Sequence, residues 1–374
     1  MKKLMMCLVL GAIVFSGCTR SNVSTEQTVI KIGLAVPLTG DVAAMGQGMK
    51  NAAMMAINEA NESAGVKGTT LVLVPVDDQA NPTHATNVAN QLVSDSQVVG
   101  VVGHLNSGCS LPASKIYARH NIAMITPAST NPAITKQGLK NIFRVCTTDD
   151  VQGSFAANLV YKNMSIKQVA IIHDKTQYGQ GLAEQFQKQF ESNNGKVLCF
   201  EGISVGDKDF KALLTKIKGL NPGLIYFGGM YSESGLIAKQ AKEVGLTVKQ
   251  MGGDGMFTPE YIKIGGESTE GNIVTMIGSP PEELASAAEF IKKYKTKYPG
   301  IDLQPYDAYT YDAVNILINA ISHLQSDKRA IIDYIASIKY EGIIGQTAFD
   351  ENGDTKNKLI TAYVIKNGKF EVLK

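Results

Sequence analysis

Residues 168–200 read QVAIIHDKTQYGQGLAEQFQKQFESNNGKVLCF, and the fold can be inferred outward from the pattern inside them. The apolar run at 168–173 is followed by a segment in which Leu182, Phe186 and Phe190 recur four residues apart, and a second apolar run, KVLCF, follows. Apolar residues at this spacing lie on one face of a helix. The stretch therefore predicts a strand, a helix and a second strand.

The same alternation continues on both sides of this stretch. Residues 209–220 form another predicted helix, whose one apolar face contains Phe210, Leu213, Leu214 and Ile217. Several apolar runs carry almost no polar alternation, which is typical of strands covered on both faces. The predicted strands span 31–36, 70–76, 98–103, 122–125, 168–173, 196–200, 223–228 and 272–277. Strands that alternate with helices form parallel sheets through right-handed crossovers, so the sequence predicts an α/β protein.

Two interruptions of this rhythm indicate more than one domain. Residues 127–150 are rich in Thr, Asn and Pro, and we interpret them as the first crossing between two lobes. The rhythm restarts after Gly278-Ser279-Pro280-Pro281, with helices predicted at 282–298, 306–324 and 328–338. The chain after residue 28 is too long for one core of ordinary size. We therefore expect lobe 1 to contain 29–148 and 279–355, and lobe 2 to contain 149–278 and 356–374.

The last part of the chain has a different pattern. Asn352-Gly353 and Asn367-Gly368 are flanked by β-rich runs, and Asn-Gly is a strong signal of a two-residue hairpin turn. The sequence therefore predicts hairpins near the C-terminus.

The first residues, MKKLMMCLVLGAIVFSGC, have the order of a secretory signal: two lysines, an apolar run and small residues before a cysteine. The run from Leu4 to Phe15 covers about 12 residues, whereas a membrane-spanning helix needs roughly 20. We expect residues 1–17 to be a signal peptide, Cys18 to be lipidated as in a bacterial lipobox, and 18–28 to be a polar tether. The alternative is ordinary signal cleavage, with Cys18 incidental.

Charge and cysteine content narrow the function further. Lys and Arg number 36 against 34 Asp and Glu, and loss of two signal lysines leaves 34 (36 minus 2) against 34. A chain without net charge lacks the electrostatic footprint of a nucleic-acid-binding protein. Beyond the expected anchor, Cys109, Cys146 and Cys199 have no metal-ligand spacing, so no metal site is expected. Three thiols leave at least one unpaired within the chain, and the sequence assigns no disulfide among them.

Ligands of open parallel sheets bind beyond the carboxyl ends of the strands, so the residues after each predicted strand are candidates. Ser107 follows the third strand and Thr130 the fourth, and their hydroxyls with nearby backbone N–H groups would form a neutral cradle for a carboxylate. Asp254 lies between glycines in GGDG and would pair with an ammonium group. For each of these residues the alternative is a local role in a turn or helix cap.

The neutral cradle and the acid together suit a zwitterion held between the lobes. Burying either charge unpaired is costly, so neutral donors on one lobe and an acid on the other would satisfy both ends of an amino acid. Because a different lobe binds each end, only a closed form satisfies both, which predicts hinge closure.

The sequence offers poor candidates for catalysis. Gly179-Gln180-Gly181 opens a predicted helix after a strand, but Glu184 occupies the third glycine position of a dinucleotide fingerprint. His173-Asp174 ends a strand, yet no nucleophile is near it in the sequence. The other histidines are scattered, at His84, His104, His120 and His323. We therefore expect neither catalysis nor a cofactor.

Several motifs together resemble one family. The segments GHLNSG at 103–108, MITPAST at 124–130, IIHDKTQYGQGLA at 171–183, DKDF at 207–210 and MGGDG at 251–255 are similar to segments of the leucine/isoleucine/valine-binding proteins of bacterial ABC transporters. The likeness runs in one order from Thr28 to the C-terminus. It implies two Rossmann-like lobes with parallel sheets, joined by a three-segment hinge, which is the type I periplasmic binding protein fold.

The resemblance also implies which residues bind the ligand. Ser107 and the loop Ala128-Ser129-Thr130 would bind the carboxylate and ammonium of an amino acid, and Tyr178 and Asp254 would complete the recognition of its main-chain groups. The side-chain pocket would be lined by Met45, Met230 and Tyr231. The family often has an aromatic residue at position 45, and GGY where this chain has GGM followed by a tyrosine. Methionine is adaptable, so these positions do not fix the size of the ligand.

We therefore expect a receptor lipoprotein of an amino-acid uptake system, outside the cytoplasm, that binds Leu, Ile or Val as a monomer and delivers it to an ABC permease. No nucleic acid, metal or cofactor is expected. Amides, urea and other amino acids stay open as ligands, although Asp254 favours an amino acid because it would pair with an ammonium group. The alternative from another class is a sensor domain that reports the ligand to a membrane signalling protein, and an enzyme is the third candidate.

Overall fold

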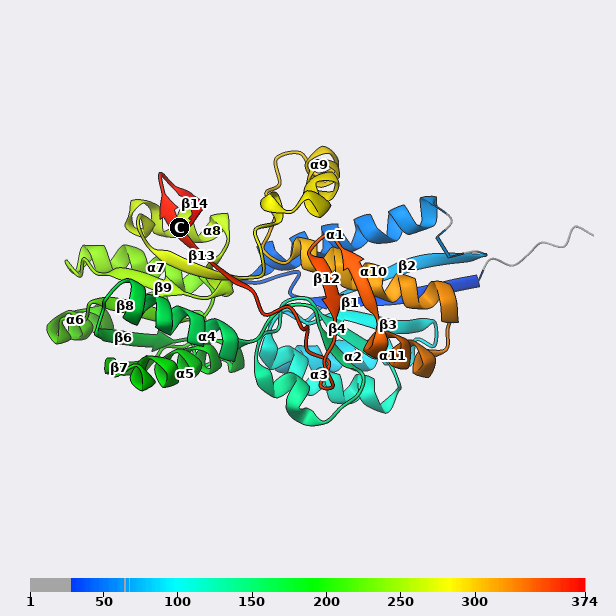
Figure 1. Cartoon of the computed structure of the whole chain (residues 1–374), viewed down its shortest axis with the longest axis horizontal. Coiled ribbons are helices and arrows are strands. Elements are labelled where there is room, and N and C mark those ends of the chain that lie inside the picture. Colours follow the sequence, from blue (N-terminus) through cyan, green and yellow to red (C-terminus); the bar gives the residue numbers. More distant parts are fainter. Residues whose placement is uncertain (1–27, 64, 67, 374) are drawn as a thin grey trace, which may run out of the picture.

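The computed structural model describes residues 28–63, 65–66 and 68–373. The expected signal peptide, Cys18 and all but the last residue of the expected tether lie outside this range. Among the described residues, no helix combines the length and apolar character needed to cross a bilayer. The chain forms two units, each built around one large β-sheet (Figure 1).

The first unit, unit A, contains a sheet in which every pairing is parallel. Its strands are β1 (Thr28–Val36), β2 (Thr69–Asp77), β3 (Val98–Gly103), β4 (Ala123–Thr126) and β5 (Ile142–Arg144). Their order across the sheet is β2-β1-β3-β4-β5. Every residue of β3 and β4 is buried, which confirms the prediction of strands covered on both faces.

Helices cover both faces of this sheet. The helices of unit A are α1 (Ala43–Glu62), α2 (Pro82–Ser94), α3 (Ser107–Arg119), α9 (Ala288–Lys297), α10 (Asp307–Leu324) and α11 (Lys328–Ser337). One face contacts α1, α10 and α11, and the other contacts α2 and α3 (Figure 1). Phe290 and Tyr294 of α9 pack against Ala52 and Met55 of α1. A short hairpin, β11 (Lys339–Gly342) and β12 (Gly345–Ala348), follows α11.

The second unit, unit B, contains a mixed sheet. Its strands are β6 (Gln168–His173), β7 (Lys196–Gly202), β8 (Leu224–Gly228), β9 (Lys249–Gly252), β10 (Ile273–Ile277), β13 (Ile360–Lys366) and β14 (Lys369–Val372). Their order is β14-β13-β10-β9-β8-β6-β7. The pairings from β7 to β10 are parallel, whereas β13 is antiparallel to both β10 and β14. The expected parallel arrangement therefore ends at this edge.

The helices of unit B again lie on both faces of its sheet. They are α4 (Asp149–Asn158), α5 (Gln177–Ser192), α6 (Lys211–Leu220), α7 (Tyr231–Glu243) and α8 (Pro259–Gly265). On one face α4 and α5 contact each other and the sheet, and α6, α7 and α8 lie together on the other. The expected apolar face of α5 is buried at Leu182, Phe186 and Phe190.

The chain passes between the units three times (Figure 1). The strand β5 is followed by α4, the strand β10 by two 3-10 turns and α9, and the hairpin β11–β12 by β13. The first and third crossings lie side by side, because the backbone of Arg144 pairs with that of Asp354.

Most predicted elements occur close to their expected ends, but some predictions were wrong or incomplete. The sequence did not predict β5 and β9, which contain three and four residues and no long apolar run. Asn367-Gly368 joins β13 to β14 as expected, whereas Asn352-Gly353 forms a turn closed by one isolated bridge. The helix expected from residue 282 begins only at Ala288, because the prolines before it favour 3-10 turns.

Candidate functional site

Four helices begin where the two sheets face each other. In unit A these are α1 after β1 and α3 after β3, and in unit B they are α5 after β6 and α7 after β8. A Cβ atom at position 108, near the start of α3, would lie 3.7 Å from the Cβ of Gln177 at the start of α5. Helix N-termini carry unpaired N–H groups and partial positive charge. The facing edges therefore form a site that suits polar ligands.

Ser107 and Thr130 form the polar part of the edge of unit A. The Oγ of Ser107 accepts a hydrogen bond from the backbone N–H of Asn131 at 3.2 Å, which leaves the Ser107 hydroxyl proton free to be donated. Thr130 is fully buried, and its Oγ1 has no hydrogen-bond partner among the described residues. Buried polar atoms are normally paired, so an unpaired hydroxyl at such an edge is suited to a ligand group. Both hydroxyls can donate to a carboxylate.

The other two residues of the expected cradle loop are bonded within unit A. The Oγ of Ser129 lies 2.9 Å from the carbonyl oxygens of both His104 and Leu105. The backbone N–H of Ala128 faces the hydroxyl oxygen of Thr126 at 3.3 Å. The structure thus brings Ser107 and Thr130 to the site, while the hydroxyl of Ser129 holds the loop in shape.

Asp254 lies in unit B and is fully buried at the start of a single 3-10 turn, η3 (Asp254–Met256). The Tyr178 hydroxyl donates to its Oδ1 at 3.0 Å, and the Tyr306 hydroxyl donates to its Oδ2 at 2.6 Å. The backbone N–H of Gly255 donates to the oxygen of Tyr178 at 3.0 Å. Burial raises the pKa of Asp254, and the two tyrosine hydroxyls act in the opposite sense. The predicted pair of Tyr178 and Asp254 is therefore in direct contact.

A second acid, Asp149, belongs to the same site. It is the first residue of α4 and is fully buried, and its backbone N–H donates to the carbonyl of Thr130 at 3.0 Å. Neither of its carboxylate oxygens has a hydrogen-bond partner among the described residues. Burial raises the pKa of Asp149 well above its usual range, and the charge of Asp254 adds to the rise, whereas the Thr130 hydroxyl lies near enough to act in the opposite sense without a well-formed hydrogen bond. An ammonium group between the two acids would offset both the burial of the carboxylate and the repulsion between the two negative charges.

Sequence reasoning missed Asp149, Tyr306 and Gln152. Asp149 falls in the stretch that was interpreted as a crossing, although two consecutive acids at its end were a usable signal. Tyr306 comes from unit A, immediately before α10, so its hydrogen bond to Asp254 joins the two units. The amide of Gln152 lies near enough to Asp254 to lower the pKa of that acid. No local pattern marks Tyr306 or Gln152, because only the tertiary fold brings them to Asp254.

The three residues expected to line the side-chain pocket are all buried. Met45 lies in the first turn of α1, and Met230 directly precedes α7. A Cβ atom at position 255 would lie 3.0 Å from the sulfur of Met230, so this methionine lies against the Asp254 turn. Burial raises the pKa of Tyr231 to about 12, and the backbone of Ala44 acts in the opposite sense.

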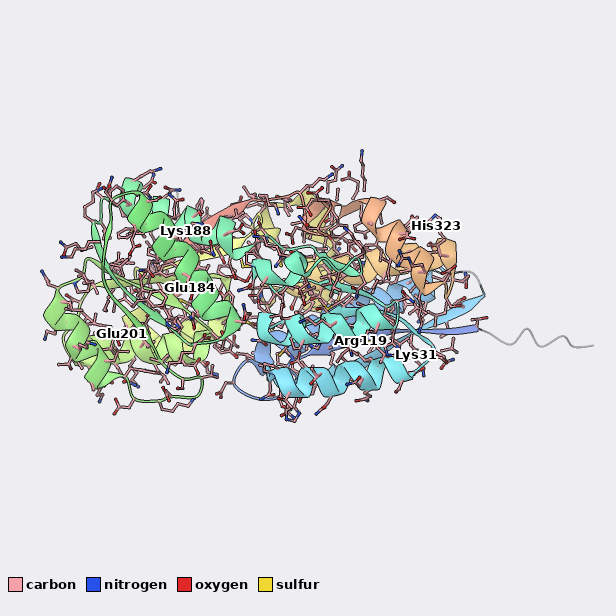
Figure 2. The ribbon with its side chains drawn as sticks, turned by 90° about the horizontal axis from the view of Figure 1, so that it is seen from below. Lys31, Arg119, Glu184, Lys188, Glu201 and His323 are labelled. Carbon is pink, nitrogen blue, oxygen red and sulfur yellow. The ribbon has the colours of Figure 1, made fainter. Side chains whose placement is uncertain are left out.

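A polar hollow of about 720 Å³ opens beside this site, between α5 and the 3-10 helix η1 (Pro132–Gln137). Asn131 and Gly181 form part of its wall, and a Cβ atom at position 181 would lie 3.9 Å from Oδ2 of Asp149. Glu184 and Lys188, which Figure 2 shows along α5, also line it. The hollow therefore lies next to Asp149, while none of the acids and hydroxyls of the site lines it.

The residues considered for catalysis make local contacts. The Nδ1 of His173 accepts from the backbone N–H of Lys175 at 3.1 Å, and its ring lies against Phe200. Asp174 accepts from the backbone N–H and hydroxyl of Thr176, which orders the start of α5. Within the described ranges, no group of three or more His, Cys, Asp or Glu side chains is placed to hold a metal ion. The three cysteines of units A and B are free thiols.

The chain is similar to known proteins over most of its length. Residues 29–369 match the family described as periplasmic binding protein. The curated Leu/Ile/Val-binding protein homolog 2 of Brucella abortus is 37% identical over 359 residues, which cover 95% of this chain and 94% of that protein. The solved leucine binding protein LivK of Thermotoga maritima has a TM-score of 0.86 and 33% identity, with 92% of this chain and 98% of that chain covered. The substrate binding protein LivJ of Streptococcus pneumoniae, solved with isoleucine, has a TM-score of 0.84 and 30% identity, with 92% and 99% covered.

Proposed function

The chain belongs to the periplasmic binding protein family, and we propose on that premise that it is the substrate-binding protein of an ABC importer for branched-chain amino acids. One observation carries the proposal. Two buried acids, Asp149 and Asp254, lie close enough for their charges to interact, and two buried hydroxyls, those of Ser107 and Thr130, lie on the neighbouring edge of unit A, with Thr130 beside Asp149. This arrangement is the complement of an amino-acid zwitterion.

The acids bind the ligand ammonium. The hydroxyl of Tyr178, from the same unit, orients Asp254 before the cleft closes, and the hydroxyl of Tyr306 from unit A donates to it in the closed form. Asp149 lies beside the Thr130 hydroxyl and has no cationic partner among the described residues, so the ammonium gives it an ion pair. An isolated buried charge is costly and a paired one is not, so the bound cation offsets a penalty that the empty site carries.

The hydroxyls bind the ligand carboxylate. Ser107 and Thr130 are neutral donors, and the first turn of α3 adds backbone N–H groups with partial positive charge. A neutral cradle needs no counter-charge of its own when the site is empty. Amides and urea lack the ammonium that the paired acids require, so these ligands suit the site less well than an amino acid does.

Met45, Met230 and Tyr231 surround the aliphatic side chain of the ligand. Complete burial of a leucine, isoleucine or valine side chain is worth about 1.5 to 3 kcal/mol. Methionine adapts to different shapes, so several branched-chain residues are accepted. A micromolar dissociation constant corresponds to about 8 kcal/mol, of which the charged ends supply the larger share.

Because each lobe binds a different end of the ligand, we expect the two units to close around it. We assign residues 29–148 and 279–355 to one lobe and 149–278 and 356–374 to the other, with the three crossings as the hinge. Hydroxyls come from the first lobe and acids from the second, so only the closed form satisfies both ends of the ligand.

The protein acts outside the cytoplasm as a receptor and not as an enzyme. The signal-like residues 1–17 and the cysteine at position 18 support export and lipid anchoring, with the tether leading to the folded body. The partner is a membrane permease that accepts the amino acid from a monomeric receptor. In this role the buried acids bind the ligand cation and take part in no reaction.

Calorimetric titration of the protein that begins at Val29 tests the proposal. The protein is first partially unfolded and refolded to remove carried-over ligand, and each of the twenty amino acids is then titrated. We expect one-to-one binding of leucine, isoleucine or valine, which Asp254→Ala abolishes and the control Asp150→Ala preserves. If none of the twenty binds, the assignment to amino acids is wrong, and amides and organic acids are the next ligands to test.

A further inference from the structure

We propose that Asn131 is a latch that ties unit A to unit B when the cleft is closed and positions the carboxylate cradle at the same time. The inference rests on the proposed function of the cradle, and it gives Asn131 a separate role. Asn131 is buried at the end of the loop after β4, where it caps η1.

Each polar group of Asn131 has a partner. Its Oδ1 accepts from the backbone N–H of Ala133 at 2.9 Å, and its Nδ2 donates to the carbonyl of Gln177 at 2.7 Å. Its backbone N–H donates to Oγ of Ser107 at 3.2 Å, and its carbonyl accepts from Nη1 of Arg144 at 2.8 Å. Of these four bonds, the one to Gln177 crosses to unit B.

The orientation of the Asn131 amide follows from its neighbours. The backbone N–H of Ala133 can only donate and therefore faces Oδ1, whereas the carbonyl of Gln177 can only accept and therefore faces Nδ2. Capping thus holds the side chain in the conformation that reaches unit B. Because the side chain is already ordered, the crossing bond costs little additional conformational entropy.

Unit B is shaped to receive this amide. Gln177 is the first residue of α5, and Gly181 lies one turn later. A Cβ atom at position 181 would overlap Nδ2 of Asn131. Glycine inside a helix lowers helix stability, so its presence here is explained by the close approach that the latch requires.

The latch and the ligand cradle share the same backbone. Because the N–H of Asn131 donates to Ser107, the Ser107 hydroxyl directs its own proton away from it and toward the ligand carboxylate. The buried guanidinium of Arg144 also donates to the carbonyl of Ser129 at 3.0 Å, and its charge is balanced by Asp354 at 2.8 Å. This brace makes the loop rigid, so displacement of the latch displaces the cradle.

The test separates the latch from the helix cap. Asn131→Asp keeps a capping oxygen but removes the donor to Gln177, and Asn131→Ser keeps the cap with a side chain too short to reach unit B. L-leucine dissociation is followed by stopped-flow tyrosine fluorescence, which can be measured without a tryptophan signal because the chain has no tryptophan. We expect both variants to release leucine about 3- to 10-fold faster, with association changed by less than about 2-fold, because one neutral hydrogen bond is lost. Gln180→Ala removes another amide that lines the hollow and bonds within unit B, so it should change neither rate.

A second readout needs no ligand. In the whole chain carrying Gly108→Cys and Gln177→Cys, the new Cβ atoms would lie 3.7 Å apart when the cleft is closed, which is within the range of a disulfide. With diamide as the oxidant, the rate at which the 108–177 cross-linked peptide forms, measured by mass spectrometry, reports how often the cleft closes. Addition of Asn131→Ser should slow cross-linking about 3- to 10-fold, and addition of Gln180→Ala should not.

Each outcome is decisive for the latch. Equal rates in the wild type and in both Asn131 variants would overturn it. A faster release in Asn131→Asp alone would also overturn it, because charge repulsion then explains the effect. If the wild type binds no leucine but Asn131→Ser still slows cross-linking, the proposed function is wrong and the latch stands.

Discussion

Replacement of Asp149 by asparagine should remove the pH dependence of leucine affinity. Burial and the charge of Asp254 raise the pKa of Asp149 well above its usual range, so in the empty site this carboxyl keeps its proton to a higher pH than an ordinary aspartate does. The ligand ammonium replaces that proton, so binding releases it. The dissociation constant should therefore fall as pH rises and level off once the pH exceeds the pKa of the empty site.

The size of the effect follows from linkage. One proton released per ligand changes the dissociation constant by up to about 10-fold per pH unit, or about 1.4 kcal/mol. Asparagine carries no proton to release, so Asp149→Asn should bind with an affinity that is flat over the same range. The ratio of variant to wild-type dissociation constants should then grow about 10-fold for each pH unit, until the wild type levels off.

The assay is calorimetric titration of L-leucine from about pH 4, near the usual pKa of an aspartate, to about pH 8, in paired buffers of different ionisation enthalpy, which counts released protons directly. Asp150→Asn serves as the control, because it removes a neighbouring charge without removing an acid of the site. The empty variant should unfold at the same temperature as the wild type or higher, since it lacks a buried carboxyl group whose ionisation is costly. Equal proton release from Asp149→Asn and the wild type would refute the reasoning.

Three further predictions concern other parts of the molecule. Burial raises the pKa of Asp307 from 3.8 to about 7, so the stability that this carboxyl contributes is fully present below pH 3.8 and is lost as pH rises through about 7. In Asp307→Asn the unfolding free energy should therefore fall less steeply with pH in that window, by up to about 1.4 kcal/mol per pH unit. Equal slopes of unfolding free energy against pH in the two proteins, measured by urea titration, would contradict this. Gly255→Ala should weaken leucine binding at least about 10-fold, because its Cβ would lie 2.8 Å from a backbone carbonyl and 2.9 Å from the ring of Tyr178. Its control, Gly219→Ala on α6, has open space around the new methyl group, so calorimetry should show unchanged affinity and denaturation a gain of about 1 kcal/mol. Among the described thiols, the half-buried Cys199 should react first with an aromatic disulfide reagent and the two buried thiols only on unfolding, and simultaneous reaction of all three would count against the fold.

The parts of the fold that sequence could predict are those with long apolar runs. The strand at 168–173 and the face of Leu182, Phe186 and Phe190 are clear because burial on both sides of a sheet leaves a continuous apolar signal. The short strands β5 and β9 carry no such signal, and pairing with neighbours far along the chain defines them. Propensity at three or four residues is too weak to decide an assignment.

The residues of the site also include some that the sequence could predict and some that it could not. Asp254 was predictable because flanking glycines set it apart, and Ser107 because it follows a strand at the start of a helix. Tyr306 and Gln152 look like ordinary helix residues in the sequence, and their contacts with Asp254 depend on how the chain folds. For Ser129 the sequence suggested too much. Its position in the loop resembles that of a ligand donor, but its hydroxyl bonds inside unit A.

The antiparallel edge of unit B sets the order in which the molecule can fold. The buried strand β10 pairs on one side with β13, which is synthesised only after α9, α10, α11 and the β11–β12 hairpin. Until that segment emerges, β10 is an apolar sheet edge with unpaired backbone groups, the kind of surface that promotes aggregation. A nascent chain therefore cannot complete this unit early, and such a delay is compatible with export of an unfolded polypeptide. Ribosomes that stop anywhere between β10 and β13 would release a product prone to associate through this edge.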